Sequence, residues 1–345
     1  MTAETLGSAG ELAVLRRIFP LLPVSDAQLV GPGDDAALLA APDGRFVVTT
    51  DMMVHGPDFR LGWSTASDLG AKAVASNLSD IAAMGAVPTG ILVAIAAPLD
   101  TPVAFLEEFA AGMSAACHAL SPGCGVVGGD LSVSDTLTIA VTAFGDLDGH
   151  APVLRSGAQV GDTVAVSGQL GVAGAGLWLL ISQGQSGEVG RYRNPDAELA
   201  ASLRREHPVL IEAQLAPSPE IALGQLANQA LASAMLDVSD GLILDARRIC
   251  LASGVGMELD PAAINREAVR LREIDPIVGD AALDLVLTGG EDHVLLATFP
   301  AGVSVPPPFR IIGRVVTGTE VRVGSEPYVK TPGWDPFTGW DGHAG

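Results

Sequence analysis

Lysine is the scarcest charged residue in this chain. Only Lys72 and Lys330 occur among 345 residues, and neither belongs to a GxxxxGK[S/T] loop. That loop uses its lysine to hold nucleotide phosphates, so the common phosphate-binding loop is excluded. The six histidines include no HExxH pair, and the sequence has no GxSxG motif. Zinc-dependent and serine-dependent hydrolysis are therefore poorly supported.

The sequence also has few basic residues and no long apolar run. Nineteen basic residues face forty acidic ones, which gives a formal net charge of -21. Such a surface repels nucleic acid and anionic lipid, so we expect neither as a partner. The longest apolar stretch, near residues 91–97, is too short to cross a bilayer, and the first residues do not resemble a secretion signal. We expect a cytoplasmic protein.

Cysteine is rare and unpaired in the sequence. The three residues Cys117, Cys124 and Cys250 form no CxxC motif. An odd number without close spacing favours buried thiols in a reducing compartment over a disulfide framework. The glycines of residues 123–128 spell GxGxxG, but they follow a predicted helix and open none. This is the reverse of the dinucleotide-binding context, so these glycines indicate a turn into a strand.

The length of the chain favours two domains, and its patterning favours an α+β fold with mixed α and β segments. Polar, glycine-containing residues near 150 predict a boundary between domain 1–150 and domain 151–345. Ser8 with Glu11 predicts one helix cap, and Thr101 before Pro102 predicts another. The predicted strands are 45–51, 91–96, 125–128, 136–144 and 163–167, and the predicted helices include 64–84 and 168–180.

The strongest chemical signal is a set of aspartates at the ends of predicted elements. One such aspartate alone is most often a cap or turn residue. As a set they lie in the least polar segments, among Gly, Ala, Val and Ile, where an unpaired carboxylate is costly to desolvate. Basic residues are almost absent from the same segments. The aspartates are Asp34, Asp35, Asp51, Asp80, Asp130, Asp237 and Asp240.

Carboxylates that share a site need a cation. Each close pair costs about 4 kcal/mol at an effective dielectric of about 20, so several pairs together would rival the stability of a domain. Magnesium fits, because it takes oxygen ligands and is often held by carboxylates together with substrate phosphates. Glycines beside these aspartates, such as Gly128 and Gly129, would let backbone N–H groups approach phosphate oxygens. They can equally be turn glycines.

Several long motifs in a fixed order resemble one known family. They are GPGDDAALL, TTDMMVHG, DLGAKAVASNLSDIAAMGAVP, GGDLS, RSGAQVGDTVAVSG, HPVL, LDVSDGL and TGGEDHVLL. The series resembles the thiamine-monophosphate kinases over nearly the whole chain, from residue 31 to residue 337. That family shares a superfamily with aminoimidazole ribonucleotide synthetase and selenophosphate synthetase. The resemblance implies a two-domain fold of that type and a homodimer whose N-terminal domains build a shared β-barrel.

The resemblance also implies roles for individual residues. Asp80, Asp130 and Asp240 would be central to catalysis. ATP, the co-substrate, would be held by Gly129, Asp130, Arg155 and Ser239. Asp58, Glu291 and Trp334 would lie at the thiamine end of the substrate. The magnesium ligands would be Asp35, Thr50, Asp51, Asp80, Asp130, Asp237 and Asp240.

The implied reaction moves the γ-phosphoryl group of ATP onto the phosphate of thiamine monophosphate. This acceptor is already anionic at neutral pH, so positioning and charge neutralisation would carry the catalysis. Two positions depart from the family: Asp58 stands where a histidine is usual, and Leu131 stands where a threonine is usual. Two alternatives stay open, a sister enzyme with another small-molecule acceptor and a non-catalytic sensor of nucleotide and metal.

Overall fold

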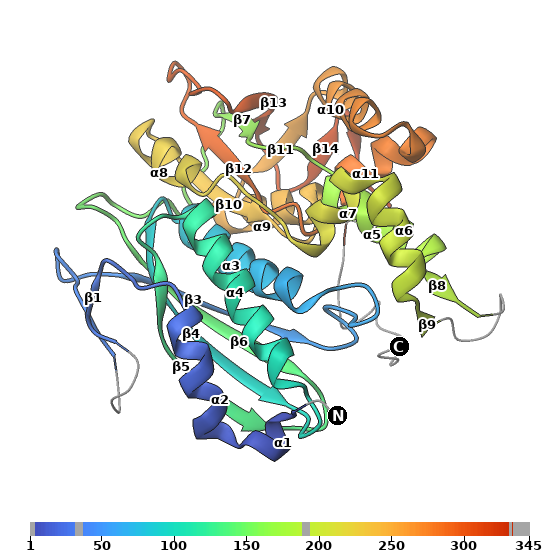
Figure 1. Cartoon of the computed structure of the whole chain (residues 1–345). Coiled ribbons are helices and arrows are strands. Elements are labelled where there is room, and N and C mark those ends of the chain that lie inside the picture. The colour runs from blue at the N-terminus through green and yellow to red at the C-terminus, as the bar shows by residue number, and fades with distance from the viewer. Residues whose placement is uncertain (1–3, 32–36, 188–193, 331–332, 334–345) are drawn as a thin grey trace.

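The computed structural model describes residues 4–31, 37–187, 194–330 and 333. Its two main β-sheets carry helices between and beside them, and residues 47–146 contain the strands of the lower sheet in Figure 1. The mixed α and β composition predicted from the sequence is confirmed. The predicted boundary near residue 150 remains a prediction; the last strand of the first sheet ends at Asp146 and the first strand of the second begins at Thr163.

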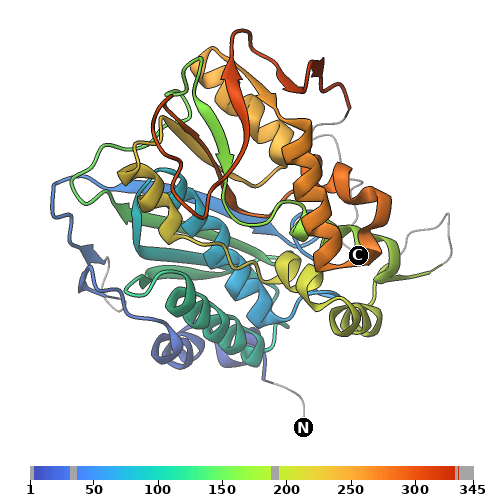
Figure 2. The ribbon, with the colours of Figure 1, turned by 90° about the horizontal axis from the view of Figure 1, so that it is seen from above.

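The first sheet has four strands in the order β3-β6-β4-β5. Strands β4 and β5 are parallel and joined by helix α4, and β6 pairs antiparallel with both β3 and β4. Helices α3 and α4 pack side by side (Figure 2). The strands are β3 (Val47–Val54), β4 (Val87–Ala97), β5 (Gly125–Val133) and β6 (Thr138–Asp146), and the helices are α3 (Ala66–Ala83) and α4 (Val103–Leu120). The segment before them contains α1 (Leu6–Ala9), α2 (Glu11–Ile18), the 3-10 turn η1 (Phe19–Leu21), β1 (Gln28–Val30) and β2 (Leu38–Leu39).

The second sheet has seven strands in the order β10-β12-β7-β13-β11-β14-β15. Its strands are β7 (Thr163–Val166), β10 (Ala234–Val238), β11 (Gly256–Leu259), β12 (Val294–Phe299), β13 (Arg310–Val316), β14 (Val321–Val323) and β15 (Glu326–Pro327). Its helices are α5 (Val172–Gln183), α6 (Ala197–Glu206), α7 (Pro208–Leu215), α8 (Ala222–Gln229), α9 (Leu242–Ser253), α10 (Pro261–Ile274), the 3-10 segment η2 (Pro276–Ala281) and α11 (Ala282–Thr288). A two-residue pair, β8 (Gln185–Ser186) and β9 (Asn194–Pro195), lies apart from both sheets.

Helix α3 is the central element, since it contacts both sheets. It begins with a capping box between Thr65 and Asp68 and is followed by Gly85 in a left-handed conformation. Gly70 allows close contact with α4, because a Cβ there would lie 2.2 Å from the carbonyl oxygen of Phe109. The other side of α3 meets β10 and β12. Most residues of α3 are buried, including several polar ones, so the helix lies in the interior of the molecule.

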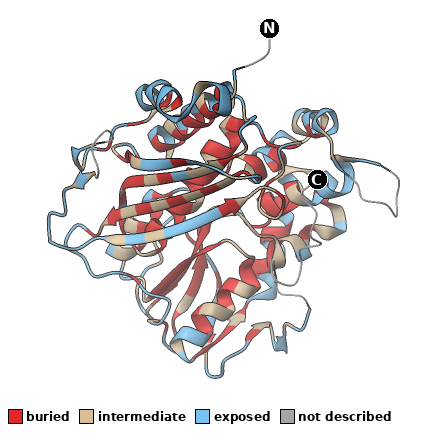
Figure 3. Ribbon diagram, turned by 90° about the horizontal axis from the view of Figure 1, so that it is seen from below, coloured by how far each residue is buried: buried red, intermediate tan, exposed pale blue. Residues whose placement is uncertain are grey.

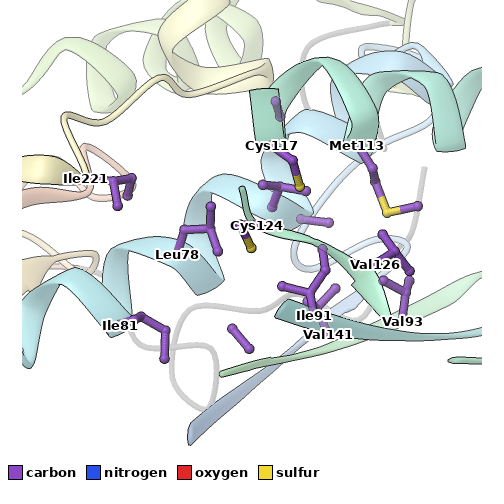
Figure 4. Close-up of a cluster of buried hydrophobic side chains, with 14 of the residues drawn as sticks. Leu78, Ile81, Ile91, Val93, Met113, Cys117, Cys124, Val126, Val141 and Ile221 are labelled. Carbon is purple, nitrogen blue, oxygen red and sulfur yellow. The ribbon is translucent and has the colours of Figure 1, made fainter. Parts of the chain in front are cut away.

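The core around α3 joins the two halves of the chain. Figure 4 shows Leu78 and Ile81 of α3 among side chains of the first sheet and of α4, with Ile221 approaching from the second half. Met235, Leu295 and other residues of the second sheet belong to the same cluster. The relative position of the two sheets is therefore fixed by a shared apolar core.

The first sheet has one covered and one open face. In β6, Ile139, Val141 and Ala143 are buried, while the residues between them are only partly buried. On the open side, Val48 is 53% exposed and Met52 is 62% exposed. The intermediate and exposed stretches of these strands are tan and pale blue in Figure 3. This open face is mainly apolar.

Some local predictions were wrong, and others were confirmed. Ser8 does not begin a helix; it is the third residue of α1, whose cap is Thr5, while Gly10 precedes α2. Helix α4 is capped one residue later than predicted, at Pro102. The three cysteines are free and buried, as expected. Within the described ranges, no helix combines the length and apolarity needed to cross a membrane.

Candidate functional site

Three predicted aspartates from three different elements meet beside α3. Asp51 comes from β3, Asp80 from α3 and Asp237 from β10. Burial raises the pKa of Asp80 to about 7, and the charges of Asp237 and Asp51 add to this effect. The pKa of Asp51 is raised by desolvation and by Asp237. Since such Coulomb effects require short separations, the fold brings these carboxylates from both halves of the chain together.

The three carboxylates differ in how far they are exposed to solvent. Asp237 is 5% exposed, Asp80 is half-buried and Asp51 is exposed. The Thr49 hydroxyl donates to Asp80 Oδ2 at 2.8 Å, and the Asp51 backbone N–H donates to Asn77 Oδ1 at 3.2 Å. Among the described residues, neither Asp51 nor Asp80 has an ion-pair partner. The acidic group therefore opens from a buried floor to solvent without a neutralising lysine or arginine.

His293 lies against the buried member of the group and was not predicted. Its Nδ1 is 3.1 Å from Asp237 Oδ2, and its Nε2 is 3.2 Å from the Ser76 hydroxyl. Burial acts to lower the pKa of His293, but the bond and the charge of Asp237, together with Glu291, raise it overall. A lone histidine carries little signal in sequence; its place inside the GGEDH motif was the only hint.

Residues 239–245 form a second acidic turn next to the first group. Asp245 is 1% exposed and accepts hydrogen bonds from the backbone N–H groups of Ser239 and Asp240. Arg248 reaches both Asp240 and Asp245 at 2.5 Å. Burial raises the pKa of Asp245 to about 7, although Arg248 opposes this. Asp245 was missed by sequence reasoning, and it holds the turn that presents Asp240.

The loop before β12 is held in an unusual backbone conformation. Glu291 and His293 have positive φ angles of 64° and 51°. Between them, the carboxylate of Asp292 accepts the N–H groups of Gly171 and Ala173 at the start of α5. Left-handed non-glycine residues are uncommon and cluster at functional sites. Asp292 was not predicted, and it anchors the loop that carries Glu291 and His293.

Glu291 takes part in a network that includes one of the two lysines. Lys72 Nζ lies 2.7 Å from Glu291 Oε1, and the Gln214 amide donates to the other oxygen. Burial acts to raise the pKa of Glu291, but Lys72 and Gln214 lower it overall. Lys72 is only 4% exposed. The pair crosses between α3 and the loop before β12.

Asp58 faces the same network. The Val54 N–H donates to Asp58 Oδ2 at 2.7 Å, so Asp58 closes the turn after β3. Burial raises the pKa of Asp58, the Val54 hydrogen bond opposes this, and the charge of Glu291 adds to the rise. The structure thus brings two of the three predicted substrate residues into one region. The third, Trp334, lies outside the described residues, as does the predicted ligand Asp35.

Thr50 and Asp130 point away from this region. In the strand register, Thr50 shares a row with Thr142 and Leu92, and Asp130 shares the next row with Ala94 and Met52. Both rows belong to the open face, whereas Asp51 faces α3. Strands β3 and β5 are opposite edges of the sheet, about 14 Å apart at about 4.8 Å per strand. One copy of the chain therefore does not join Asp130 to Asp51.

The other residues predicted to hold ATP are also dispersed. Gly129 has a packing role, because a Cβ there would lie 2.0 Å from the carbonyl oxygen of Val93. Arg155 is exposed, and its carbonyl accepts the hydroxyl of Ser253, the last residue of α9. Asp240 precedes the other end of this 12-residue helix, about 18 Å away. Ser239, by contrast, lies at the site, where its carbonyl accepts the Glu291 N–H at 2.7 Å.

The donor set suits a hard divalent cation that keeps other oxygen ligands. Within the described part of the chain, no three His, Cys, Asp or Glu side chains converge closely enough to hold a metal by themselves. Magnesium usually binds through one or two carboxylates plus water and substrate phosphates. Burial and the charges of Asp237 and Asp51 raise the pKa of Asp80, and a bound cation would relieve the repulsion among these carboxylates. Asp51, Asp80 and Asp237 therefore fit magnesium only as part of a larger oxygen shell.

A cavity of about 220 Å³ lies beside this group. It is lined by Ser79 of α3, Ser167 and Gly168 after β7, and Asp292 and His293 before β12. The segment 217–221 also lines it. His293 thus lines this cavity and also contacts Asp237 of the acidic group.

Comparison with known proteins identifies the family of this chain. The AIR synthase related protein N-terminal domain matches residues 33–147, and the corresponding C-terminal domain matches residues 159–324. Thiamine-monophosphate kinase of Mycobacterium tuberculosis (strain ATCC 25618 / H37Rv) is 42% identical over 336 residues, covering 97% of this chain and 94% of the relative.

Two solved structures are also similar to this chain. Thiamine-monophosphate kinase from Stenotrophomonas maltophilia K279a is 31% identical, with a TM-score of 0.72 and coverage of 91% of this chain and 95% of that one. AaThiL complexed with AMPPCP and TMP is 30% identical, with a TM-score of 0.70 and coverage of 97% and 99%. The two-domain organisation inferred from the motifs is confirmed by these matches. The chain belongs to the thiamine-monophosphate kinase family of AIR synthase related proteins.

Proposed function

We propose that this chain is an ATP-dependent thiamine-monophosphate kinase. The reaction breaks the bond between the β- and γ-phosphates of ATP and forms a bond from the γ-phosphorus to a phosphate oxygen of thiamine monophosphate. The products are thiamine diphosphate and ADP. The relative AaThiL has been seen with AMPPCP, an ATP analogue, and with TMP, which supports the same pair of ligands here.

The observation that carries the proposal is the acidic group of Asp51, Asp80 and Asp237. These side chains come from both halves of the chain, and burial together with the charge of Asp237 raises the pKa of both Asp51 and Asp80. A fold does not gain stability from such an arrangement, so it indicates a ligand site. Bound Mg²⁺ would neutralise the negative charge on the phosphate oxygens during phosphoryl transfer. The carboxylates of this chain would hold and orient it.

Other residues would bind and orient the substrates. Ser239 and Asp240 sit in the turn that Asp245 fixes, next to the acidic group. Asp58 lies near the ion pair of Glu291 with Lys72, and a cationic thiazolium would be attracted by the two carboxylates. Since thiamine monophosphate brings its own anionic acceptor oxygen, no strong base is needed.

We also propose that the chain forms a homodimer through the open face of the first sheet. Val48 and Met52 are large apolar side chains that stand exposed there. Burying such a face against a second copy would remove it from water. The roles proposed for Thr50, Gly129 and Asp130 in metal and ATP binding depend on this dimer, because one copy separates Thr50 and Asp130 from Asp51. Light scattering should give a dimer mass, and Met52→Glu should give a monomer.

One residue favours a second candidate function. Asp58 stands where the family usually has histidine, and its position near Glu291 makes the region more acidic. A sister enzyme that phosphorylates a different cationic small molecule would use the same ATP site. The two candidate functions differ only in the small molecule that accepts the phosphoryl group.

A direct assay tests the proposal. The purified protein is incubated with ATP, Mg²⁺ and thiamine monophosphate, and thiamine diphosphate is measured by fluorescence after oxidation to its thiochrome derivative. Asp80→Asn provides the inactive control. We expect one ADP for each thiamine diphosphate. ADP formation without thiamine diphosphate, or with another phosphorylated acceptor only, would overturn the assignment of the substrate.

A further inference from the structure

We propose that His293 is a positioning residue that holds the carboxylate of Asp237 against α3 and so preforms the acidic group across the two halves of the chain. The inference rests on the proposed function, because it takes Asp237 to be a ligand of the divalent cation. It concerns a side chain that is 6% exposed and contacts that ligand directly.

The backbone fixes where His293 stands. Strands β10 and β12 pair antiparallel with Val238 opposite Val294, and the His293 N–H donates to the carbonyl of Val238 at 2.9 Å. His293 therefore lies one residue beyond the β12 ladder, next to the strand end that carries Asp237. Its φ of 51° turns the chain out of the extended conformation at this point. The carboxylate of Asp292, bonded to the start of α5, keeps the loop in place.

The imidazole ring connects two separate elements. Its Nδ1 faces Asp237 on the second sheet, and its Nε2 faces Ser76 on α3. The single hydrogen of the Ser76 hydroxyl has an acceptor in the Lys72 carbonyl at 3.0 Å, one turn back along the helix. The Ser76 side chain is thus fixed on the helix and lies at hydrogen-bond distance from Nε2. Both nitrogens of the ring therefore have a partner.

Asp237 requires such a partner more than its neighbours do. Among the described residues, His293 is its one ion-pair partner, while the nearby carboxylates of Asp51 and Asp80 repel it. Without the ring, this repulsion would turn Asp237 away from the group before a cation arrives. Carboxylate ligands of metals are commonly oriented by a second hydrogen bond, whose loss costs about 10- to 100-fold in metal affinity.

The chain contains a matched control. His207 and Asp275 form another histidine–aspartate pair, with Nδ1 2.6 Å from Oδ2. His207 precedes α7 and Asp275 precedes η2, so neither belongs to the elements that carry the acidic group. Replacing His207 removes a comparable pair without touching Asp237.

The experiment measures Mn²⁺ binding to the full chain, with and without AMPPCP, from the loss of the free Mn²⁺ electron paramagnetic resonance signal. We expect His293→Leu to weaken Mn²⁺ binding by about 10- to 100-fold and Ser76→Ala by a smaller factor. His293→Gln keeps an N–H donor and should recover part of the affinity. His207→Leu should leave the affinity unchanged. Thermal unfolding shows which variants are folded.

The proposal is overturned if the folded His293→Leu variant binds Mn²⁺ as tightly as the wild type. Should that variant not fold, an unchanged affinity in Ser76→Ala overturns it instead. Wild-type protein that binds no Mn²⁺ also overturns it, together with the metal site. Wild-type protein that binds Mn²⁺ but does not phosphorylate thiamine monophosphate refutes the proposed function alone, and the affinities of the variants still decide the role of His293.

Discussion

Two aspartates on helix α3 have opposite surroundings. Asp68 lies in the first turn, where it accepts the Thr65 N–H and contacts Arg204 through two nitrogens, each at 2.9 Å. Burial acts to raise the pKa of Asp68, but these hydrogen bonds and the Arg204 charge lower it overall. Asp80 lies in the last turn, receives one hydrogen bond from Thr49, and has a pKa raised to about 7.

The difference separates a structural carboxylate from a functional one. A negative charge is favoured at the N-terminus of a helix and disfavoured at its C-terminus. Asp68 thus has a cap, a favourable helix end and an arginine, and the fold alone accounts for it. Asp80 has an unfavourable helix end and acidic neighbours, so only a bound cation would compensate it. The same residue type in one helix therefore serves two purposes.

The largest expected effect tests this assignment at Asp80. Asp80→Asn keeps the size and the Thr49 contact but removes the charge that would hold the cation. We expect turnover to fall by a factor of at least about 10³, comparable with the loss of a main electrostatic contribution to a transition state. Steady-state assays of thiamine diphosphate formation measure it. Activity near that of the wild type would show that Asp80 is not part of the metal site.

The same variant should be more stable than the wild type when no metal is present. Because the pKa of Asp80 is raised from 3.8 to about 7, the folded state binds its proton more tightly than the unfolded state. Its contribution to stability is therefore present at low pH and is lost as the pH rises from about 4 to about 7. As the pH rises, the Asp80→Asn variant should lose about 1 to 2 kcal/mol less of its free energy of unfolding than the wild type does. Urea unfolding at several pH values measures this difference.

The next largest effect concerns ligands. Mg²⁺ with AMPPCP should raise the unfolding temperature far more than either ligand alone, because each strengthens binding of the other to the folded state. Ligand at about 100 times its dissociation constant adds about 2.7 kcal/mol. The Asp80→Asn variant should respond to AMPPCP equally with and without Mg²⁺. An equal response in the wild type would mean that the carboxylates have no metal role.

A smaller effect is expected at Asp68, the matched control on the same helix. Asp68→Asn removes the bidentate contact with Arg204, which still has Glu212 at 2.6 Å. We expect a loss of about 1 to 3 kcal/mol in the free energy of unfolding, with turnover within about threefold of the wild type. Chemical denaturation and the kinase assay measure the two quantities. Loss of turnover without loss of stability would contradict the comparison.

The smallest effect concerns the substrate end. Asp58→Ala should raise the Michaelis constant for thiamine monophosphate about three- to tenfold, because one carboxylate near a cation contributes about 1 kcal/mol. The constant for ATP should barely change. Trp334 lies outside the described residues. The Trp334→Ala variant should also raise the Michaelis constant for thiamine monophosphate, because it removes a cation–π contact worth about 0.5 to 2 kcal/mol. If the Michaelis constant for thiamine monophosphate is unchanged in both variants, Asp58 and Trp334 do not belong to the substrate site.

Much of the acidic site could be predicted from the sequence, but its grouping could not. Asp51, Asp80 and Asp237 were selected because they lie in apolar segments that lack basic residues. The same criterion selected Asp130, which faces the open side of the sheet. In β3, the sequence VVTTDMMV has similar polarity on both faces. Its alternation therefore does not reveal that Asp51 faces α3 while Thr50 faces away.

The sequence by itself determined the helix that carries Asp80, the scarcity of cations and the acidic character of the site, because these follow from local pattern and composition. Only the tertiary structure decided which carboxylates are compensated. Arg204 is 136 residues from Asp68, and His293 is 56 residues from Asp237. Such pairings depend on how the two sheets pack around α3, and no local pattern encodes that packing.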